Sequence, residues 1–242
     1  MLKLWFKTPI IEFYCHPDFF DFIPKPVPAS KKIAEWYKKI PPVLSTGPRR
    51  FNTGAKVFSA KKCMPMLDAM SLGFTIPLGG DVNIRTNKDR TLIEAGLNNE
   101  SSWVEYHPIQ QLGGSTFPGY PTPPLKFINK WVVKTAPGYS TLFIPPVNYF
   151  DNRFTCLTAL VDTDTYQKEV NFPAVWHLSD FDDVLHAGTP LVTCFPIKRS
   201  IMEVDINPRE MTEKESRYIN SIAKGQHSRD SVYTNDLRAK RK

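Results

Sequence analysis

Short apolar runs separated by turn residues dominate the middle of the chain. Between Phe74 and Arg199 these runs include FTIPLGGDVNIRT, SSWVEYH, FTCLTALVDT and PLVTCFPIKR, and Gly, Pro, Asn and Asp punctuate them at short intervals. This cadence is typical of short antiparallel strands joined by tight turns. An alternating stretch at residues 2–14 predicts one more strand. The pattern therefore predicts a mainly β domain, built as an antiparallel barrel or sandwich.

Two short helices are expected in the N-terminal half. The segment KKIAEWYKK is followed by two prolines, and Ser30 stands where it can cap a helix that runs through Lys39. The segment MPMLDAMSLG has Pro65 in its first turn and Gly73 at its end, the order that helices favour. Before both, HPDFFDFIPKPVP at residues 16–28 is expected to be a proline-stiffened loop.

The pattern changes again near the C-terminus. NPREMTEKESRYINSIAKG predicts a helix capped by Asn207, with Pro208 at its first position, Glu210 in capping-box register and Gly225 at its end. The apolar side of this helix is narrow. It therefore either packs on the β domain through one stripe or reaches out to a partner.

These patterns predict two parts of unequal size. Residues 1–205 form a single β-rich domain, and residues 206–242 form the C-terminal helix and an extended basic tail, which begins at residue 226. The 22 prolines support many short elements joined by rigid turns, because proline is excluded from helix interiors and central strands.

The net charge of +7 adds a basic character to this picture. Such a charge favours an acidic partner or nucleic acid without requiring one. Lysines gather at 31–32, 38–39 and 61–62, and the chain ends in LRAKRK. Two interpretations stay open: a contact with nucleic acid through the basic tail, and faces that are simply solvated.

The cysteines and the N-terminus favour an intracellular protein. Cys15, Cys63, Cys156 and Cys194 show no C-x-x-C spacing, so they predict reduced, mostly buried thiols and neither a zinc ribbon nor a disulfide framework. The first residues are interrupted by charges, and no eighteen apolar residues run together. We expect no signal peptide, no membrane span and a cytoplasmic location.

One metal site can be considered from spacing. His16 and Asp18 form an H-x-D pair, the spacing at which two side chains on one strand face bind iron beside a third ligand. His186, with Lys198 or Arg199, would complete the site of a 2-oxoglutarate oxygenase. Because a proline separates the pair and the pair precedes the β region, a turn in which Asp18 caps its neighbours is the competing interpretation. We predict no cofactor.

The segment LVDTDTYQKEV, residues 160–170, places two carboxylates and a tyrosine on an otherwise apolar run. It follows SLGFTIPLGGDVNI and APGYSTLFIPPVN, and GTPLVTCFP comes after it. In this order the segments resemble the β-clip fold of deoxyuridine triphosphatases and deoxycytidine triphosphate deaminases. The resemblance implies that Asp162 orients an attacking water and that Tyr166 packs on the base. Asp164, expected in the turn, and Asn148 are further ligand-binding candidates.

The chain also departs from the pattern of those enzymes. Where they present arginine, serine and glycine to the triphosphate, this chain has IPPVNYF, which contains no charge to balance an anion. GFTIPL lacks the aspartate of the first motif, and the C-terminus has no glycine-rich lid. These departures argue against triphosphate hydrolysis.

A second resemblance covers most of residues 30–200. EWYKKIPP, KKCMPMLDAMSLGF, APGYSTLFIPPVN, TALVDTDTY, VNFPAVW and AGTPLVTCFPIKR occur in that order. In the order of these segments, the chain resembles a family of uncharacterised proteins of tailed phages of marine cyanobacteria and of some bacteria. The resemblance implies a phage or bacterial cytosolic origin, and it implies no particular activity.

Three functions are therefore considered, and the sequence leaves open whether the chain is an enzyme. The first is a non-catalytic binding or assembly protein, encoded by a phage and built into the virion. The second is an enzyme acting on a nucleotide or small metabolite, with Asp162 or Asp164 as base, and the third is the iron oxygenase. The expected partners are other proteins or further copies of the chain, and the enzyme resemblance allows a trimer. The expected location is the host cytoplasm or the virion.

Overall fold

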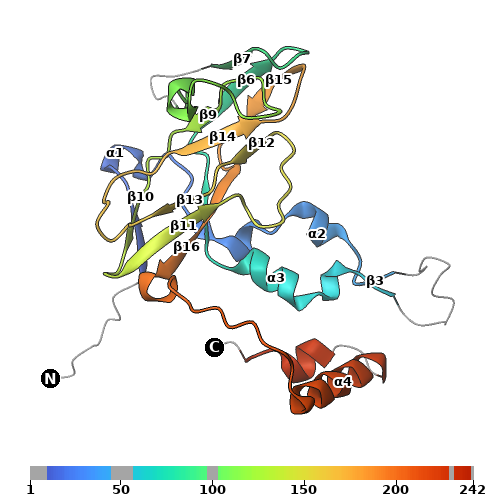
Figure 1. Cartoon of the computed structure of the whole chain (residues 1–242). Coiled ribbons are helices and arrows are strands. Elements are labelled where there is room, and N and C mark those ends of the chain that lie inside the picture. Colours follow the sequence, from blue (N-terminus) through green and yellow to red (C-terminus); the bar gives the residue numbers. More distant parts are fainter. Residues whose placement is uncertain (1–9, 45–56, 97–102, 229–231, 241–242) are drawn as a thin grey trace. The chain divides into compact units, whose positions relative to one another are not determined.

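The computed structural model describes residues 10–44, 57–96, 103–228 and 232–240, and these residues form a mainly β protein with several antiparallel sheets (Figure 1). The chain divides into two compact units, Met1–Met202 and Glu203–Lys242. The division lies close to the boundary expected after residue 205.

The largest sheet of the first unit has five strands in the order β13-β11-β16-β5-β2, and every neighbouring pair is antiparallel. Its longest strand, β16, is buried continuously from Pro190 to Cys194, as expected for a central strand. The five strands are β2 (Val27–Pro28), β5 (Phe74–Pro77), β11 (Tyr139–Ile144), β13 (Ala159–Val161) and β16 (Pro190–Lys198).

Two smaller sheets and two strand pairs complete the β part. The four-stranded sheet has the order β12-β14-β9-β8, and the three-stranded sheet has the order β15-β6-β7. The four strands are β8 (Val104–Tyr106), β9 (Leu125–Phe127), β12 (Phe154–Cys156) and β14 (Phe172–Trp176). The three are β6 (Val82–Thr86), β7 (Ile93–Gly96) and β15 (Phe181–Leu185). The pairs are β1 (Ile11–Tyr14) with β10 (Val132–Thr135), and β3 (Val43–Leu44) with β4 (Val57–Phe58).

The core follows from the alternation of side chains along these strands. On β6, Val82, Ile84 and Thr86 are buried while Asn83 and Arg85 are exposed, so one face of the strand packs inward. Fully burying a large apolar side chain stabilises the fold by about 1.5–3 kcal/mol. The largest fully buried side chains include Trp176, Phe127, Phe143 and Phe172.

The expected mainly β character is confirmed, but none of the sheets formed by the described residues closes into a barrel. Most strands are only two to six residues long, because Gly, Pro, Asn and Asp end them early. The edge strands of the three larger sheets are β13 and β2, β12 and β8, and β15 and β7.

The helices of the first unit correct part of the expectation. α3 (Met64–Ser71) has a proline in its first turn, and Gly73 follows it with φ +78°, both as predicted. The single helix expected to start at Ser30 is instead a 3-10 turn, η1 (Ala29–Lys32), followed by α2 (Glu35–Lys39). The two are separate because Ile33 and Ala34 keep an extended backbone and Ala34 is buried.

A helix also occurs where a loop was expected. α1 (Pro17–Phe20) begins after His16, whose side chain accepts a hydrogen bond from the Asp18 amide. Further 3-10 turns are η3 (Ala60–Lys62), η4 (Ile109–Leu112) and η5 (Arg199–Ile201). The strand expected at residues 2–14 is present as β1, and residues 2–9 lie outside the described ranges.

The second unit contains α4 (Glu213–Ser228) and a short π-helix, η6 (Tyr233–Leu237). The expected cap at Asn207 is wrong. Thr212 and Glu215 form the capping box, in which the Thr212 amide donates to Glu215 and the Glu215 amide donates to the Thr212 hydroxyl. α4 continues past Gly225, and η6 replaces part of the expected extended tail. No helix within the described ranges combines the length and apolar character needed to cross a bilayer.

Candidate functional site

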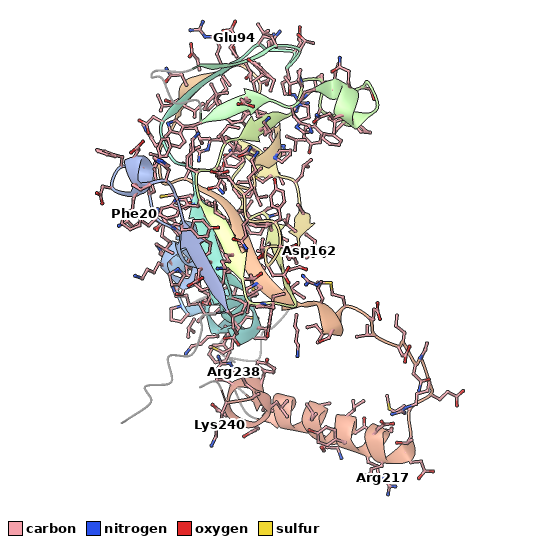
Figure 2. All side chains as sticks on the ribbon, turned by 90° about the vertical axis from the view of Figure 1, so that its left-hand side faces the viewer. Phe20, Glu94, Asp162, Arg217, Arg238 and Lys240 are labelled. Carbon is pink, nitrogen blue, oxygen red and sulfur yellow. The ribbon has the colours of Figure 1, made fainter. Side chains whose placement is uncertain are left out.

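The hairpin that follows β13 carries Asp162, and Figure 2 shows this residue at the surface of the first unit. The Ser140 hydroxyl donates to Asp162 Oδ1 at 2.5 Å, and Arg199 Nη1 lies 3.5 Å from the same oxygen. The side chain of Asp162 is 62% exposed. Asp162 is therefore a solvated carboxylate that is tied to the start of β11.

Asp164, which the sequence predicted as a turn residue, accepts more hydrogen bonds through its side chain than Asp162 does. Arg199 donates to it twice, from Nη1 at 2.9 Å and from Nη2 at 2.5 Å, and the Gly138 amide donates at 2.8 Å. Only 6% of the side chain is exposed. The hydrogen bonds from Arg199, followed by that from Gly138, lower the pKa of Asp164 to about 2. Asp164 therefore stays ionised and fixes the hairpin to the end of β16.

A buried chain of hydroxyl groups lies beneath the hairpin. Thr163 Oγ1 lies 2.7 Å from Thr141 Oγ1 and 2.8 Å from Thr135 Oγ1, and Thr135 donates its proton to the Tyr139 carbonyl. Because each hydroxyl has one proton, Thr163 must donate to Thr135 and Thr141 must donate to Thr163. The residue between the two aspartates therefore has a structural role in the core.

The predicted ligand-binding residues do not converge within one chain. Tyr166 is partly exposed on the hairpin, and its amide donates to the Asp162 carbonyl at 2.8 Å. Asn148 lies beyond the other end of β11, where its carbonyl accepts from Trp36 Nε1 at 2.8 Å. Since a strand rises about 3.3 Å per residue, Ser140 and Ile144 are about 13 Å apart. Asp162 and Asn148 therefore lie at opposite ends of β11.

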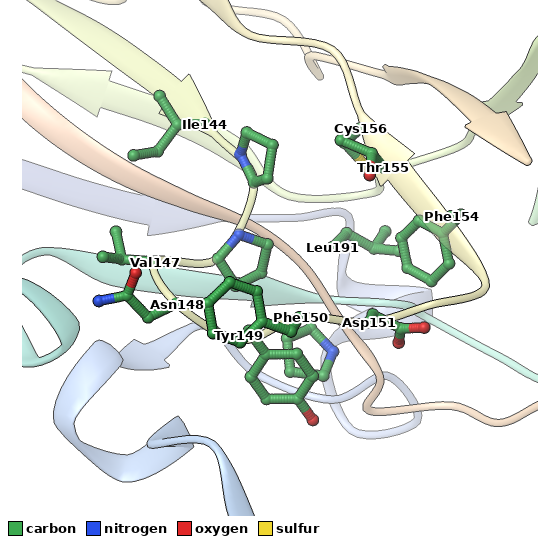
Figure 3. A pocket seen from close by; sticks show the side chains of 13 residues that line it. Ile144, Val147, Asn148, Tyr149, Phe150, Asp151, Phe154, Thr155, Cys156 and Leu191 are labelled. Carbon is green, nitrogen blue, oxygen red and sulfur yellow. The ribbon is translucent and has the colours of Figure 1, made fainter. Parts of the chain in front are cut away.

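A cavity of about 360 Å³ surrounds the segment that contains Asn148 (Figure 3). Its one charged lining residue, Asp151, accepts from Arg153 Nε at 2.9 Å and from Nη2 at 2.7 Å, so the two charges are paired. Burial is also the main cause of a raised pKa at Tyr149. The pocket is thus largely apolar, its one carboxylate is paired, and residues 144–151, 154–156 and 190–191 line it.

The rim of this pocket has a strained backbone. Asn148 and Phe150 both have φ +54°, in the left-handed region that is unfavourable for a bulky side chain such as phenylalanine. Phe150 is 74% exposed, and its ring centroid lies 5.7 Å from that of Trp36 on α2. Strain of this kind persists where the surrounding structure imposes it, and it is concentrated at functional sites.

One polar pair lies beside the pocket. Thr155 Oγ1, which lines the cavity, is 2.7 Å from His177 Nε2. Burial, and then the charge of Arg90, lower the pKa of His177, so its imidazole is neutral at pH 7. No spacing rule in the sequence links Thr155 to a histidine 22 residues further along the chain.

The suggested iron ligands are not brought together. His16 Nδ1 lies 3.2 Å from Asp18 Oδ2 at an exposed helix start, whereas His186 Nδ1 lies 3.4 Å from Asp81 Oδ2. Across the described ranges, no three histidine, cysteine, aspartate or glutamate side chains are grouped so that they could hold a metal ion. His16, Asp18 and His186 therefore do not form the iron site that the H-x-D spacing suggested.

No protein-family model matches the chain, and no curated protein matches it. The residues of the hairpin and the pocket therefore carry the functional assignment alone.

Proposed function

We propose that the protein is a non-catalytic binding or assembly protein that uses a β-clip-like scaffold. The observation that carries this proposal is the contact of Arg199 with both hairpin aspartates. It holds Asp164 through two hydrogen bonds and approaches Asp162, which the Ser140 hydroxyl also holds. Asp162, to which the enzyme resemblance gives the catalytic role, and Asp164 thus link β11, the hairpin and the end of β16.

The pocket supports the same proposal. Binding of a triphosphate requires cations or several amide donors directed at the phosphate oxygens. The pocket instead presents proline and aromatic side chains, and Arg153 is already paired with Asp151. Apolar pockets with few polar groups are typical of binding sites.

A competing function is an enzyme that acts on a nucleotide or small metabolite. It draws support from Asp162, which remains well exposed beside the partly exposed Tyr166. Against it, Asn148 and the pocket lie at the far end of β11, so one chain does not assemble base, ring platform and ligand pocket. A trimer could unite them between copies, and light scattering of the purified protein measures that state.

The phage resemblance extends the proposal to a virion component made in the host cytoplasm. Mass spectrometry of purified virions, compared with a lysate of infected host cells, tests this assignment. We expect peptides of this chain in the virion at a constant ratio to the major capsid protein. Their absence from virions, with presence in the lysate, would overturn the virion assignment.

A further inference from the structure

Three short helices of the first unit, η1, α2 and η3, carry an excess of positive charge. In the described ranges 25–44 and 57–62 there are seven lysines and a single acidic residue, Glu35. Six of these lysines lie on η1, α2 and η3, which we call the basic lobe: Lys31, Lys32, Lys38, Lys39, Lys61 and Lys62. α2 and α3 lie together on one flank of the strands, and η3 contacts both (Figure 1).

Specific contacts hold the basic lobe together. Lys61 Nζ donates to the carbonyls of Tyr37 at 3.0 Å and Lys38 at 2.8 Å, which places η3 against the end of α2. Lys38 pairs with Glu35 at 2.7 Å. Three exposed ammonium groups, those of Lys31, Lys39 and Lys62, have no hydrogen bond or ion pair with another described residue. These three groups are free to meet an anion.

The basic lobe borders the rim of the apolar pocket. Trp36 and Lys39 are three residues apart on α2, so their side chains lie on neighbouring positions of one helix face. Trp36 donates to the Asn148 carbonyl and contacts the Phe150 ring. The charges of Glu35 and Lys38 also act on Tyr149, a pocket residue. Lys39 and the exposed Phe150 ring are thus both neighbours of Trp36.

We propose that the basic lobe and the pocket rim bind single-stranded nucleic acid. Lys31, Lys39 and Lys62 contact phosphates, and a base stacks on Phe150 at the mouth of the pocket. Proteins that bind single strands combine these two elements, a positively charged surface and an exposed aromatic side chain. Single strands are favoured over duplex because a base can reach a ring only when its face is unstacked. This inference rests on the proposed function, in which the pocket binds its ligand without altering it.

Fluorescence anisotropy with a labelled mixed-sequence oligonucleotide, as DNA and as RNA, tests the proposal between 50 and 200 mM salt. Neutralising the three lysines (Lys31→Gln, Lys39→Gln, Lys62→Gln) should lower the slope of log affinity against log salt by about 2, since each phosphate contact on a single strand contributes about 0.7. Phe150→Ala should weaken binding by roughly 5- to 150-fold and leave this slope unchanged.

Two matched control variants each remove three positive charges outside the basic lobe. Gln at Lys88, Lys168 and Lys198, and separately Gln at tail positions 240–242, should each leave the slope within the error of the unchanged protein. Circular dichroism confirms that every variant is folded.

The inference is overturned by absence of binding at 50 mM salt, by an equal loss of slope in either control, or by full affinity in Phe150→Ala. Tighter binding of polyglutamate than of the oligonucleotide would identify an acidic protein as the partner and would also overturn it. Gel analysis of the recovered oligonucleotide separates this failure from failure of the proposed function. An intact but unbound strand contradicts only this inference, whereas a processed strand contradicts the non-catalytic function.

Discussion

Arg199 joins three segments of the chain through one guanidinium group. Its Nη1 donates to the Tyr139 carbonyl at 3.1 Å, to Ser140 Oγ at 3.3 Å and to Asp164 at 2.9 Å. Tyr139 also pairs with Lys198 in the β11–β16 register, which brings Arg199 to this position. The arginine therefore fixes the hairpin on the sheet, and the two aspartates should differ in how much stability they contribute.

Asp164→Asn removes the charge that Arg199 and the Gly138 amide both require. We expect it to lower the melting temperature by about 5 to 10 °C, because the partly buried Arg199 loses its closest anion and keeps only the more distant Asp162. Asp162→Asn, at an exposed position on the same hairpin, should change it by less than about 2 °C. Thermal melts followed by circular dichroism measure both. Equal losses in the two variants would show that the hairpin does not depend on the Arg199–Asp164 pair.

The same pair predicts a dependence on acid. Hydrogen bonds from Arg199 and Gly138 lower the pKa of Asp164 from 3.8 to about 2 in the folded protein. The unfolded chain therefore takes up this proton first, so the stabilisation is complete above about pH 4 and is lost as the pH falls toward 2. The difference in melting temperature between the unchanged protein and Asp164→Asn should shrink across that window. A difference that stays constant from about pH 5 to pH 2 would contradict this assignment.

The sequence pattern indicates the two aspartates of the hairpin but gives no sign of their main partner, Arg199. Carboxylates within an apolar run are conspicuous, so Asp162 and Asp164 could be singled out from local pattern alone. Arg199 is 35 residues beyond Asp164, and only the pairing of β11 with β16 brings the two together. The exposure of Phe150 and its contact with Trp36 likewise depend on tertiary structure, because IPPVNYF gives no local sign of its strained backbone.

At the scale of elements, the LGGD segment that follows β5, residues 78–81, packs against Trp103. A Cβ atom on Gly79 or Gly80 would overlap the indole of Trp103, whereas one on Gly96 meets no atom within 4 Å. Trp103 also packs against the core. The two glycines are therefore needed for close packing at the end of β5.

Gly80→Ala should destabilise the protein by about 1–3 kcal/mol, the usual cost of overpacking a well-packed site. Gly96→Ala, at the end of β7, is the matched control and should stay within about 0.5 kcal/mol of the unchanged protein. Urea unfolding gives both free energies. An equally stable Gly80→Ala would show that Trp103 can move away without cost.

The accuracy of the predicted elements depended on whether their signals are local. α3 was predicted correctly because Pro65 and Gly73 mark its ends within the segment itself. The start of α4 was misplaced because two capping patterns compete, and the Thr212–Glu215 box prevailed over Asn207 and Glu210. Of the expected barrel or sandwich, the barrel does not form among the described residues. Closure depends on which strands become edges, and side-chain alternation does not determine strand order.

At the scale of the whole molecule, the second unit exposes much apolar surface for its size. Val204 is 71% exposed and Ile206 is 86% exposed, and Met211, Tyr218 and Ile219 are also exposed. The core cluster lies entirely in the first unit. The change from strand pattern to polar helix puts the expected boundary after residue 205, and the two compact units divide after Met202.

A chain ending at Met202 should therefore fold without the second unit. We expect a cooperative melt within about 3 °C of the full chain, because the whole core is retained. Circular dichroism and light scattering of the shortened chain measure its melt and its state of association. An aggregated or non-cooperative fragment would show that the first unit depends on residues 203–242.

We propose that the hairpin of Asp162 takes no part in a chemical reaction. The most direct measurement is chromatography of deoxynucleoside triphosphates after long incubation with the unchanged protein, with Asp162→Asn and without protein. We predict that all three samples show the same composition. Conversion by the unchanged protein that disappears in a folded Asp162→Asn variant would contradict the claim and identify Asp162 as a catalytic residue.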